Sequence, residues 1–197
     1  MATTAFRRRS QRARPDHAAP VRLAHGEAPW TERIALANGR ELVLRPIDRR
    51  DAPALRAGFA VLTPEEVRLR FLHPMTELGE AEALRLATPD ARREFALVAA
   101  EPLPPGEALV GAVARASIEG DSADFAILVA RPLARLGLGA WMLTRLVQWA
   151  RRKRLRTVRG DVLLENDAML RLARSLGFAC APVPGEPGLQ RVCLELG

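Results

Sequence analysis

One stretch in the second half of the chain joins an apolar strand pattern, a glycine loop and an amphipathic helix pattern. Phe125 to Ala130 are mostly apolar, Gly137 and Gly139 follow a proline turn, and apolar residues then recur at helical spacing: Met142, Leu143, Leu146, Val147 and Ala150. The first N–H groups of a helix lack intrahelical partners and carry partial positive charge. Glycines let an anion approach the backbone, and Arg131 and Arg135 add charge. The stretch therefore predicts a site for an anion with several phosphate oxygens.

A Gly-x-Gly pair also fits a plain strand-to-helix turn, and two common phosphate motifs are absent here. The dinucleotide fingerprint requires a third glycine where this chain has Met142, and a P-loop requires a Gly-Lys-Ser/Thr sequence that the chain lacks. If this loop binds phosphate, it belongs to another class of motif.

A second motif follows further along the chain. Arg156 to Leu164 has a strand pattern, and a helix pattern then runs from Asn166 to the pair Gly177-Phe178. The two motifs together resemble the GNAT acetyltransferases. The pyrophosphate loop of that family has the form Arg/Gln-x-x-Gly-x-Gly/Ala, which here reads Ala134 to Gly139, and its next helix runs from an Asn to a Gly-Phe pair.

Earlier segments resemble the catalytic domain of bacterial protein lysine acetyltransferases, so the resemblance begins near Arg40. These segments are Arg45-Pro46-Ile47 with Asp51, Leu69 to Leu72, and Glu94 to Val98. The resemblance implies an N-acetyltransferase that uses acetyl-CoA as cosubstrate without a metal, with a protein lysine as the expected acceptor. A small amine or polyamine is the first alternative. A catalytically inactive acyl-CoA-binding or nucleic-acid-binding module is the second.

Composition limits the remaining classes of protein. The 197 residues are 48% apolar, which is enough for one domain with a core, and no apolar run approaches a membrane span. The net charge of +7 favours anionic partners such as coenzyme A. Cys180 and Cys193 lack metal-type spacing, so we expect reduced thiols in a cytoplasmic protein. We also expect that the protein binds neither a membrane nor nucleic acid. A disulfide across a terminal hairpin is the lesser alternative, and the oligomeric state is left open.

We expect a disordered basic tail over residues 1–29 and a folded domain over residues 30–197. The first segment holds many arginines and few large apolar residues; an arm that contacts nucleic acid is the alternative. Related bacterial enzymes often carry a fused acyl-CoA-synthetase-like or nucleotide-sensing domain, for which we expect no room in this chain.

The expected fold is α/β (α+β), a mixed and mostly antiparallel sheet of about six to seven strands with helices on both faces. Arg33 to Ile47 predicts a hairpin with a two-residue turn at Asn38-Gly39. Asp48 or Asp51 is expected to cap a helix that ends near Val61, and Thr63 with Glu66 predicts a capping box. A further helix is expected over Glu80 to Ala87. The expected later strands are Glu94 to Ala100, Ala108 to Ile118, Phe125 to Ala130, Arg156 to Leu164, Phe178 to Ala181 and Arg191 to Leu196.

The resemblance also implies roles for single residues. The backbone N–H of Leu128 matches the group that holds the acetyl carbonyl, and the pantetheine arm is expected to run beside this strand. Asn166 matches a residue that often holds the cofactor, although an N-cap of the following helix explains it equally well. The expected cofactor-binding residues are Leu128, Val129, Arg135, Leu136, Gly137, Leu138, Gly139, Ala140 and Asn166.

Asp124 is the expected general base. A lysine amine has an unperturbed pKa of about 10.4, so a carboxylate must accept its proton. The resembling enzymes carry Glu-Phe-Ala at the start of this strand, where the present chain has Asp124-Phe125-Ala126. The shorter aspartate is expected to act through a water molecule. A polar residue at the start of a strand is the alternative explanation, and Glu119 and Asp121 are weaker candidates for the base.

Two positions depart from the family pattern. Many GNAT enzymes protonate the leaving thiolate with a tyrosine at the position of Ala173, and this chain contains no tyrosine. Ser175 is a poor substitute, so water is expected to serve. Ala134 stands where the family prefers arginine or glutamine, and Arg135 could supply that charge instead.

Overall fold

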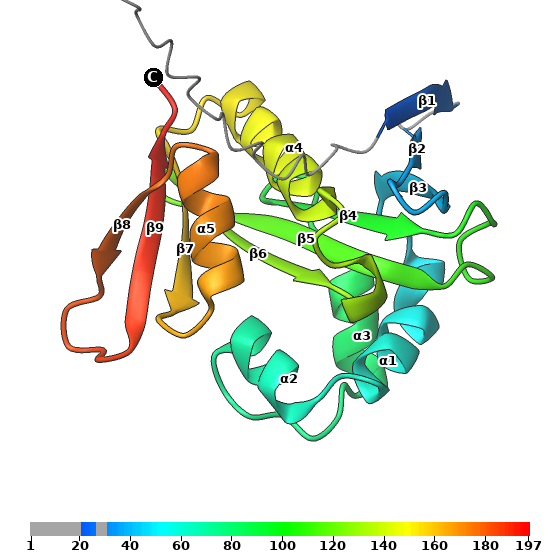
Figure 1. The fold of residues 1–197 in the computed structure, drawn as a ribbon, viewed down its shortest axis with the longest axis horizontal. Coiled ribbons are helices and arrows are strands. Elements are labelled where there is room, and N and C mark those ends of the chain that lie inside the picture. The colour runs from blue at the N-terminus through cyan, green and yellow to red at the C-terminus, as the bar shows by residue number, and fades with distance from the viewer. Residues whose placement is uncertain (1–20, 27–30) are drawn as a thin grey trace, which may run out of the picture.

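The computed structural model describes residues 21–26 and 31–197 (Figure 1). Its strands form one sheet of nine, in the order β1-β2-β3-β4-β5-β6-β7-β9-β8. All neighbours are antiparallel except the parallel pair β6 and β7. The strands are β1 (Val21–Gly26), β2 (Thr31–Ala35), β3 (Glu41–Pro46), β4 (Glu94–Ala100), β5 (Val110–Glu119), β6 (Ser122–Val129), β7 (Thr157–Leu163), β8 (Ala179–Pro182) and β9 (Leu189–Glu195).

Helices cover both faces of the sheet, and each face has its own apolar core (Figure 1). On one face lie α4 (Leu138–Arg152) and α5 (Asp167–Ser175), whose apolar residues pack on the central strands. On the other face lie α1 (Ala52–Ala60), α2 (Pro64–Phe71) and α3 (Glu80–Ala87). The expected fold class is therefore confirmed.

The strands have two buried faces because their side chains alternate between the two cores. Along β6, Ala123 and Phe125 belong to the core under α4, while Leu128 lines the opposite face. Asp124 is even-numbered like Leu128 and therefore lies on the face that carries α1, α2 and α3. This alternation decides which side chains of β6 meet the candidate site.

The strands β6 and β7 pair only at their starts and then separate, and we call this separation the fork. Their parallel pairing covers only three positions and ends at Asp124 opposite Arg159, although both strands continue. Phe125 packs at the base of the fork. A Cβ on Gly160 would lie 3.0 Å from both the Phe125 ring and the Phe125 carbonyl oxygen, so this close approach requires a glycine. Among residues 21–26 and 31–197, no strand pairs with the rest of β6 on its β7 side.

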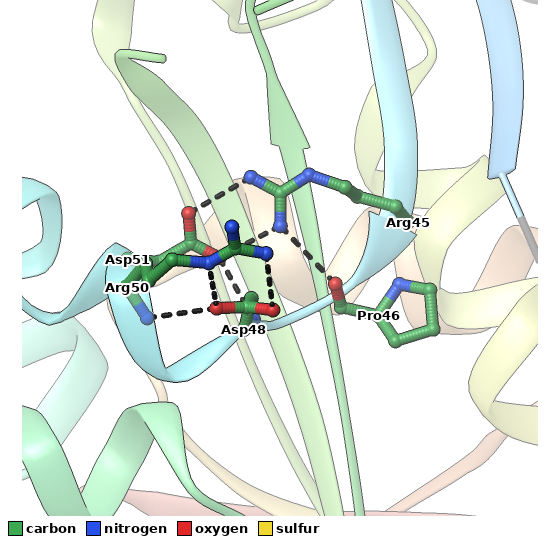
Figure 2. Close-up of polar contacts among 5 residues, drawn as sticks. All are labelled: Arg45, Pro46, Asp48, Arg50 and Asp51. Carbon is green, nitrogen blue, oxygen red and sulfur yellow. Dashed lines mark hydrogen bonds and ion pairs between the residues drawn. The ribbon is translucent and has the colours of Figure 1, made fainter. Parts of the chain in front are cut away.

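A buried ion pair fixes the connection from β3 to α1 (Figure 2). The Arg45 guanidinium donates to both carboxylate oxygens of Asp51, at 2.7 and 2.8 Å, and the Asp51 side chain is fully buried. The backbone N–H of Asp48 also donates to Asp51, and the Asp48 carboxylate accepts from Arg50. A bidentate pair holds a fixed geometry, so it sets where the first helix begins.

Two expectations about the first third of the chain need correction. The hairpin loop is a three-residue loop rather than a two-residue turn, because Leu36 N–H donates to Arg40 and only Gly39 has a positive φ, of 79°. Residues 21–26, expected within a disordered tail, form β1 alongside β2, which brings the sheet above the expected six to seven strands. The expectation for residues 1–20 and 27–29 falls outside the described residues.

The two cysteines are free thiols. Ala179 pairs with Cys193 and Cys180 pairs with Val192, so the cysteines occupy successive positions of the β8–β9 ladder. Successive positions point to opposite faces of a sheet. The geometry therefore does not favour the disulfide that was weighed as an alternative.

Candidate active site

The glycine loop presents free backbone donors at the start of α4. Gly137 is the N-cap of this helix with a φ of 78°, and Arg135 also has a positive φ, of 63°. In the described part of the chain no side chain caps the helix start, and the first turn of α4 carries no acidic residue. Trp141 N–H donates to Gly137 at 3.1 Å as the first turn closes. The N–H groups of Leu138 to Ala140 therefore lack intrahelical acceptors, and they suit an anion.

Gly139 has a second reason to be a glycine. A Cβ at this position would lie 3.2 Å from Cδ2 of Leu172 on α5 and 4.0 Å from Cγ2 of Val129 on β6. The residue thus lets the first turn of α4 pack against α5 beside the open side of β6. Close packing and access for a phosphate both require the missing side chain.

The direction of the N–H groups along β6 selects which of them face the fork. Ala130 N–H donates to Gly111 of β5 at 2.9 Å. N–H groups alternate in direction along a strand, so Leu128 N–H also points to β5, whereas those of Ile127 and Val129 point into the fork. The geometry favours Ile127 and Val129 over Leu128 as donors to a ligand, and Val129 was among the expected cofactor-binding residues.

Asp124 lies where the fork begins and has a carboxylate environment suited to proton transfer. It is half-buried, and its Oδ2 lies 3.6 Å from Nε of Arg159, which donates at 2.7 Å to Glu119. Burial and the negative charge of Glu119 raise the pKa of Asp124 to about 6, against the opposing effect of Arg159. A base with a pKa just below neutral is mostly ionised at pH 7 and can still hold a proton.

The weaker candidates for the base have other roles. Glu119 accepts a hydrogen bond from Arg159, and its side chain is 59% exposed. Asp121 lies in the turn between β5 and β6, near Arg156 and in contact with Ser122. The geometry therefore favours Asp124.

The helix α5 supplies an N-cap and no acid. The Asn166 side-chain oxygen accepts from Met169 N–H at 3.1 Å, so the capping explanation holds and only the amide NH₂ group is left to donate to a ligand. Ala173, at the position of the family tyrosine, is fully buried in the core. The Ser175 hydroxyl donates to the Leu172 carbonyl. These two positions offer no proton donor for a thiolate.

A cavity of about 370 Å³ lies on the same face of the sheet as Asp124. Its walls come from α1, α2, β5 and the end of β6, and Leu128 points into it. Arg70 and Arg115 line it as well. We did not identify either arginine from the sequence, although Arg115 interrupts an otherwise apolar strand run, which was the one available signal.

Within residues 21–26 and 31–197, no helix is both long and apolar enough to cross a membrane. The same residues hold no cluster of histidine, cysteine and acidic side chains that could bind a metal ion.

Comparisons with known proteins extend these observations. Residues 41–179 match the family described as acetyltransferase (GNAT) domain. The GNAT domain of S. lividans PAT superposes with a TM-score of 0.74 at 24% identity, over 87% of this chain and 99% of that one. The yncA protein of Salmonella typhimurium, solved with its cofactor acetyl-CoA, gives a TM-score of 0.58 at 21% identity, over 79% of this chain and 94% of that one.

A longer protein shares the same fold in part. The cAMP-binding acyltransferase of Mycobacterium smegmatis gives a TM-score of 0.57 at 18% identity. The match covers 85% of this chain and 47% of that one, so the present chain spans about half of its length. The structural likenesses establish the fold, and the family match covers more than half of the sequence. The chain therefore belongs to the GNAT family of N-acetyltransferases.

Proposed function

We propose that this chain transfers the acetyl group of acetyl-CoA to a primary amine, with Asp124 as the general base. The observation that carries the proposal is the arrangement along β6. A carboxylate with a raised pKa stands where the fork opens, two N–H groups face the fork, and an uncapped helix start follows. These are the three groups that acetyl transfer from a phosphate-bearing thioester requires.

The cosubstrate would lie along the open side of β6. The expected donors to its pyrophosphate are the backbone groups from Arg135 to Ala140, and Val129 would bond the pantetheine arm. Ile127 lies three residues from Asp124, about 10 Å along the strand, so its N–H is the better placed donor for the acetyl carbonyl. That separation leaves room for the water through which Asp124 would act.

The reaction requires no side chain of the protein to protonate the leaving thiolate. Asp124 accepts one proton from the protonated amine, and the neutral nitrogen forms a bond to the acetyl carbon. The carbon–sulfur bond breaks, and the new amide nitrogen loses its second proton to water. The coenzyme A thiolate leaves and takes a proton from solvent, and Asp124 later returns its proton to solvent. The buried Ala173 and the hydrogen-bonded Ser175 support this route, because neither side chain supplies a proton.

The acceptor class is open between two candidates. The sequence resemblance to bacterial protein lysine acetyltransferases favours a lysine of a protein. The cavity on the same face of the sheet as Asp124 favours a small amine, because a volume of about 370 Å³ is typical of small-molecule sites. A cytoplasmic location remains the expectation from the sequence.

Two measurements on the purified chain test the proposal. Isothermal titration should show acetyl-CoA binding, and a thiol-release assay should show coenzyme A production with at least one amine from panels of proteins, peptides and small amines. Tight binding with no release from any acceptor would favour an inactive acyl-CoA-binding module. Absence of binding would overturn the proposal itself.

A further inference from the structure

The cavity on the Asp124 face of the sheet is apolar except for a few charged side chains, and Asp124 itself does not line it. Its apolar wall includes Leu55, Phe59, Leu62, Phe71, Leu78 and Val113. One charged pair on the wall is already satisfied. The Glu66 carboxylate accepts from Thr63 at 2.8 and 2.9 Å and from Arg131 at 2.9 Å. The two other charged side chains on the wall are Arg70 and Arg115, and of these Arg115 has a carboxylate, Glu94, within salt-bridge distance.

Arg70 is the first of these arginines. Among residues 21–26 and 31–197, no carboxylate lies within salt-bridge distance of its guanidinium, which sits 4.8 Å from the centre of the Phe71 ring. Burial and the nearby positive charge of Arg115 lower the pKa of Arg70 to about 10, so it stays protonated at neutral pH. Arg70 is half-buried, and a cation that is partly removed from water without a counter-ion is stabilised by an anionic ligand.

Arg115 is the second arginine and is only partly satisfied. Its Nη1 donates to the Leu86 carbonyl at 3.2 Å. Its Nη2 lies 3.6 Å from the Glu94 carboxylate and is buried without a hydrogen-bond partner in the described structure. Since Arg115 also lowers the pKa of Arg70, the two charges act on the same region of the cavity.

The register of the sheet places Arg115 diagonally across from the base. Asp124 pairs with Ser117, Ala126 pairs with Arg115, and Leu128 pairs with Val113. Paired residues lie on one face, and diagonal neighbours in adjacent strands are about 7–8 Å apart. Arg115 therefore stands between Asp124 and the apolar wall at Leu128 and Val113. A ligand in the cavity would reach past this arginine toward the base.

We propose that the cavity binds the carboxylate and the apolar body of the acceptor, so that the acceptor is a small amino carboxylic acid. Its carboxylate pairs with Arg70 and Arg115, its apolar part fills the cavity, and its amine faces Asp124. This inference rests on the proposed acetyl transfer and names the substrate class of that site. Protein lysine becomes the competing outcome.

The test compares acids with matched carboxamides, which keep the amine and the shape but lose the negative charge. Leucine, phenylalanine and 6-aminohexanoate are each assayed against the corresponding amide and against a lysine peptide, with coenzyme A release as the readout. We expect kcat/KM to be at least tenfold higher for the best acid than for its amide. Equal values for acid and amide, or a lysine peptide that exceeds every acid, would overturn the substrate class while leaving acetyl transfer intact.

Three variants locate the effect. Arg70→Gln should lower kcat/KM for the acid at least tenfold and leave kcat/KM for the amide unchanged. Arg70→Lys keeps the positive charge and should retain part of the preference for the acid over the amide. Arg56→Gln is the matched control, because Arg56 is exposed on α1 and does not line the cavity. A loss with Arg70→Gln that is equal for acid and amide would contradict a carboxylate contact.

Ligand binding tests the carboxylate site even if no acceptor is acetylated. The N-acetylated form of the best acid, or of leucine if no acid reacts, is titrated calorimetrically into the wild type and into Arg70→Gln. We expect at least tenfold weaker binding to the variant. If no amine releases coenzyme A but this difference holds, the proposed reaction fails and the carboxylate site stands. Equal affinity for both proteins would reject the carboxylate site.

Discussion

Asp124 should make activity and stability respond to pH in opposite directions. Its pKa is raised from 3.8 to about 6 by burial and by Glu119. Proton transfer from the amine needs the ionised carboxylate, so kcat/KM should fall as the pH drops through about 6. A raised carboxyl pKa means that the folded state binds the proton more tightly, so this group's contribution to stability is full below pH 3.8 and is lost as the pH rises through about 6.

The pH prediction is checked by kcat/KM profiles and by denaturant titrations of the wild type and Asp124→Asn. The variant removes the titration, so the stability of the wild type relative to the variant should decline between pH 4 and pH 7. Asp48, whose pKa is lowered to about 2, is present in both proteins and cancels in the comparison. A relative stability that rises over this range would contradict the raised pKa.

Replacement of the Asp124 carboxylate separates a base from a residue that merely shapes the strand. Asp124→Asn should lower turnover near neutral pH by roughly 10²–10³, within the range of general base catalysis. Acetyl-CoA affinity should barely change, and high pH should rescue part of the activity because the amine then loses its proton to solvent. Asp124→Glu restores the residue of the resembling enzymes and should retain or raise activity. Full activity of Asp124→Asn at every pH would point to Glu119, Asp121 or a free amine.

The position of Asp124 could be predicted from the sequence, but those of Arg70 and Arg115 could not. The family resemblance around Phe125 identified Asp124, which lies at the start of the strand whose far end leads to the glycine loop. Arg115 joins the site only because β5 pairs with β6 in one register, with Arg115 opposite Ala126. Arg70 reaches the same cavity from α2. Such contacts depend on tertiary packing, which spacing along the chain does not encode.

The contact between α4 and α5 complicates the test of the phosphate loop. Gly139→Val would place a branched side chain at the expected phosphate position and against Leu172, which already lies 3.2 Å from an added Cβ. We expect acetyl-CoA affinity to fall by at least tenfold, about 1.4 kcal/mol. Calorimetric titration of Gly139→Val and of Gly139→Val with Leu172→Ala separates the two causes. If the second substitution restores full affinity, packing alone requires the glycine.

The free energy of unfolding should fall when one charge of the Arg45–Asp51 pair is removed, and it should change little when both charges are removed. Arg45→Met leaves the fully buried Asp51 carboxylate without its partner and should cost about 3–5 kcal/mol in the free energy of unfolding. The double variant with Asp51→Leu should recover most of the loss, as measured by urea denaturation. Arg50→Met, at the exposed pair with Asp48, is the control and should change stability little. No recovery in the double variant would mean that the pair itself sets the connection.

The start of α2 and both ends of α3 were predicted correctly from the sequence. Thr63 and Glu66 form the predicted capping box of α2, and Glu80–Ala87 is the predicted third helix. The hairpin turn was mispredicted because Asn38-Gly39 fits two loop types, and only the pairing of Leu36 with Arg40 distinguishes them. Asn166 shows the same limit, since an N-cap and a ligand contact use the same side chain.

The order of the strands is the part of the fold that the sequence could not supply. The chain pattern predicted strands and helices on both faces, but the sheet order with β9 between β7 and β8 depends on pairing between distant segments. The fork arises from the same pairing, because β7 leaves β6 after Asp124 and Arg159. The open side of β6, where we place the cosubstrate, is therefore a property of the whole sheet.

The amino-terminal boundary of the folded domain depends on whether β1 stabilises the sheet. β1 pairs with β2 over Val21 to Gly26, and β2 carries Glu32, whose buried carboxylate accepts from Arg145 of α4 at 2.7 Å. Removal of residues 1–29 would turn β2 into an edge strand beside this buried charge. The pairing of β1 therefore favours a loss of stability on this deletion, whereas composition alone predicts almost none.

Two truncated proteins test the boundary. Deletion of residues 1–29 should lower the melting temperature by several degrees, because each kcal/mol lost corresponds to about 2–4 °C for a chain of this size. Deletion of residues 1–20 should leave it nearly unchanged, since that segment has few large apolar residues to bury. Thermal denaturation followed by circular dichroism compares both with the full chain. Equal melting temperatures for the two deletions would mean that β1 contributes nothing, and the domain would then begin near residue 30 as the composition indicates.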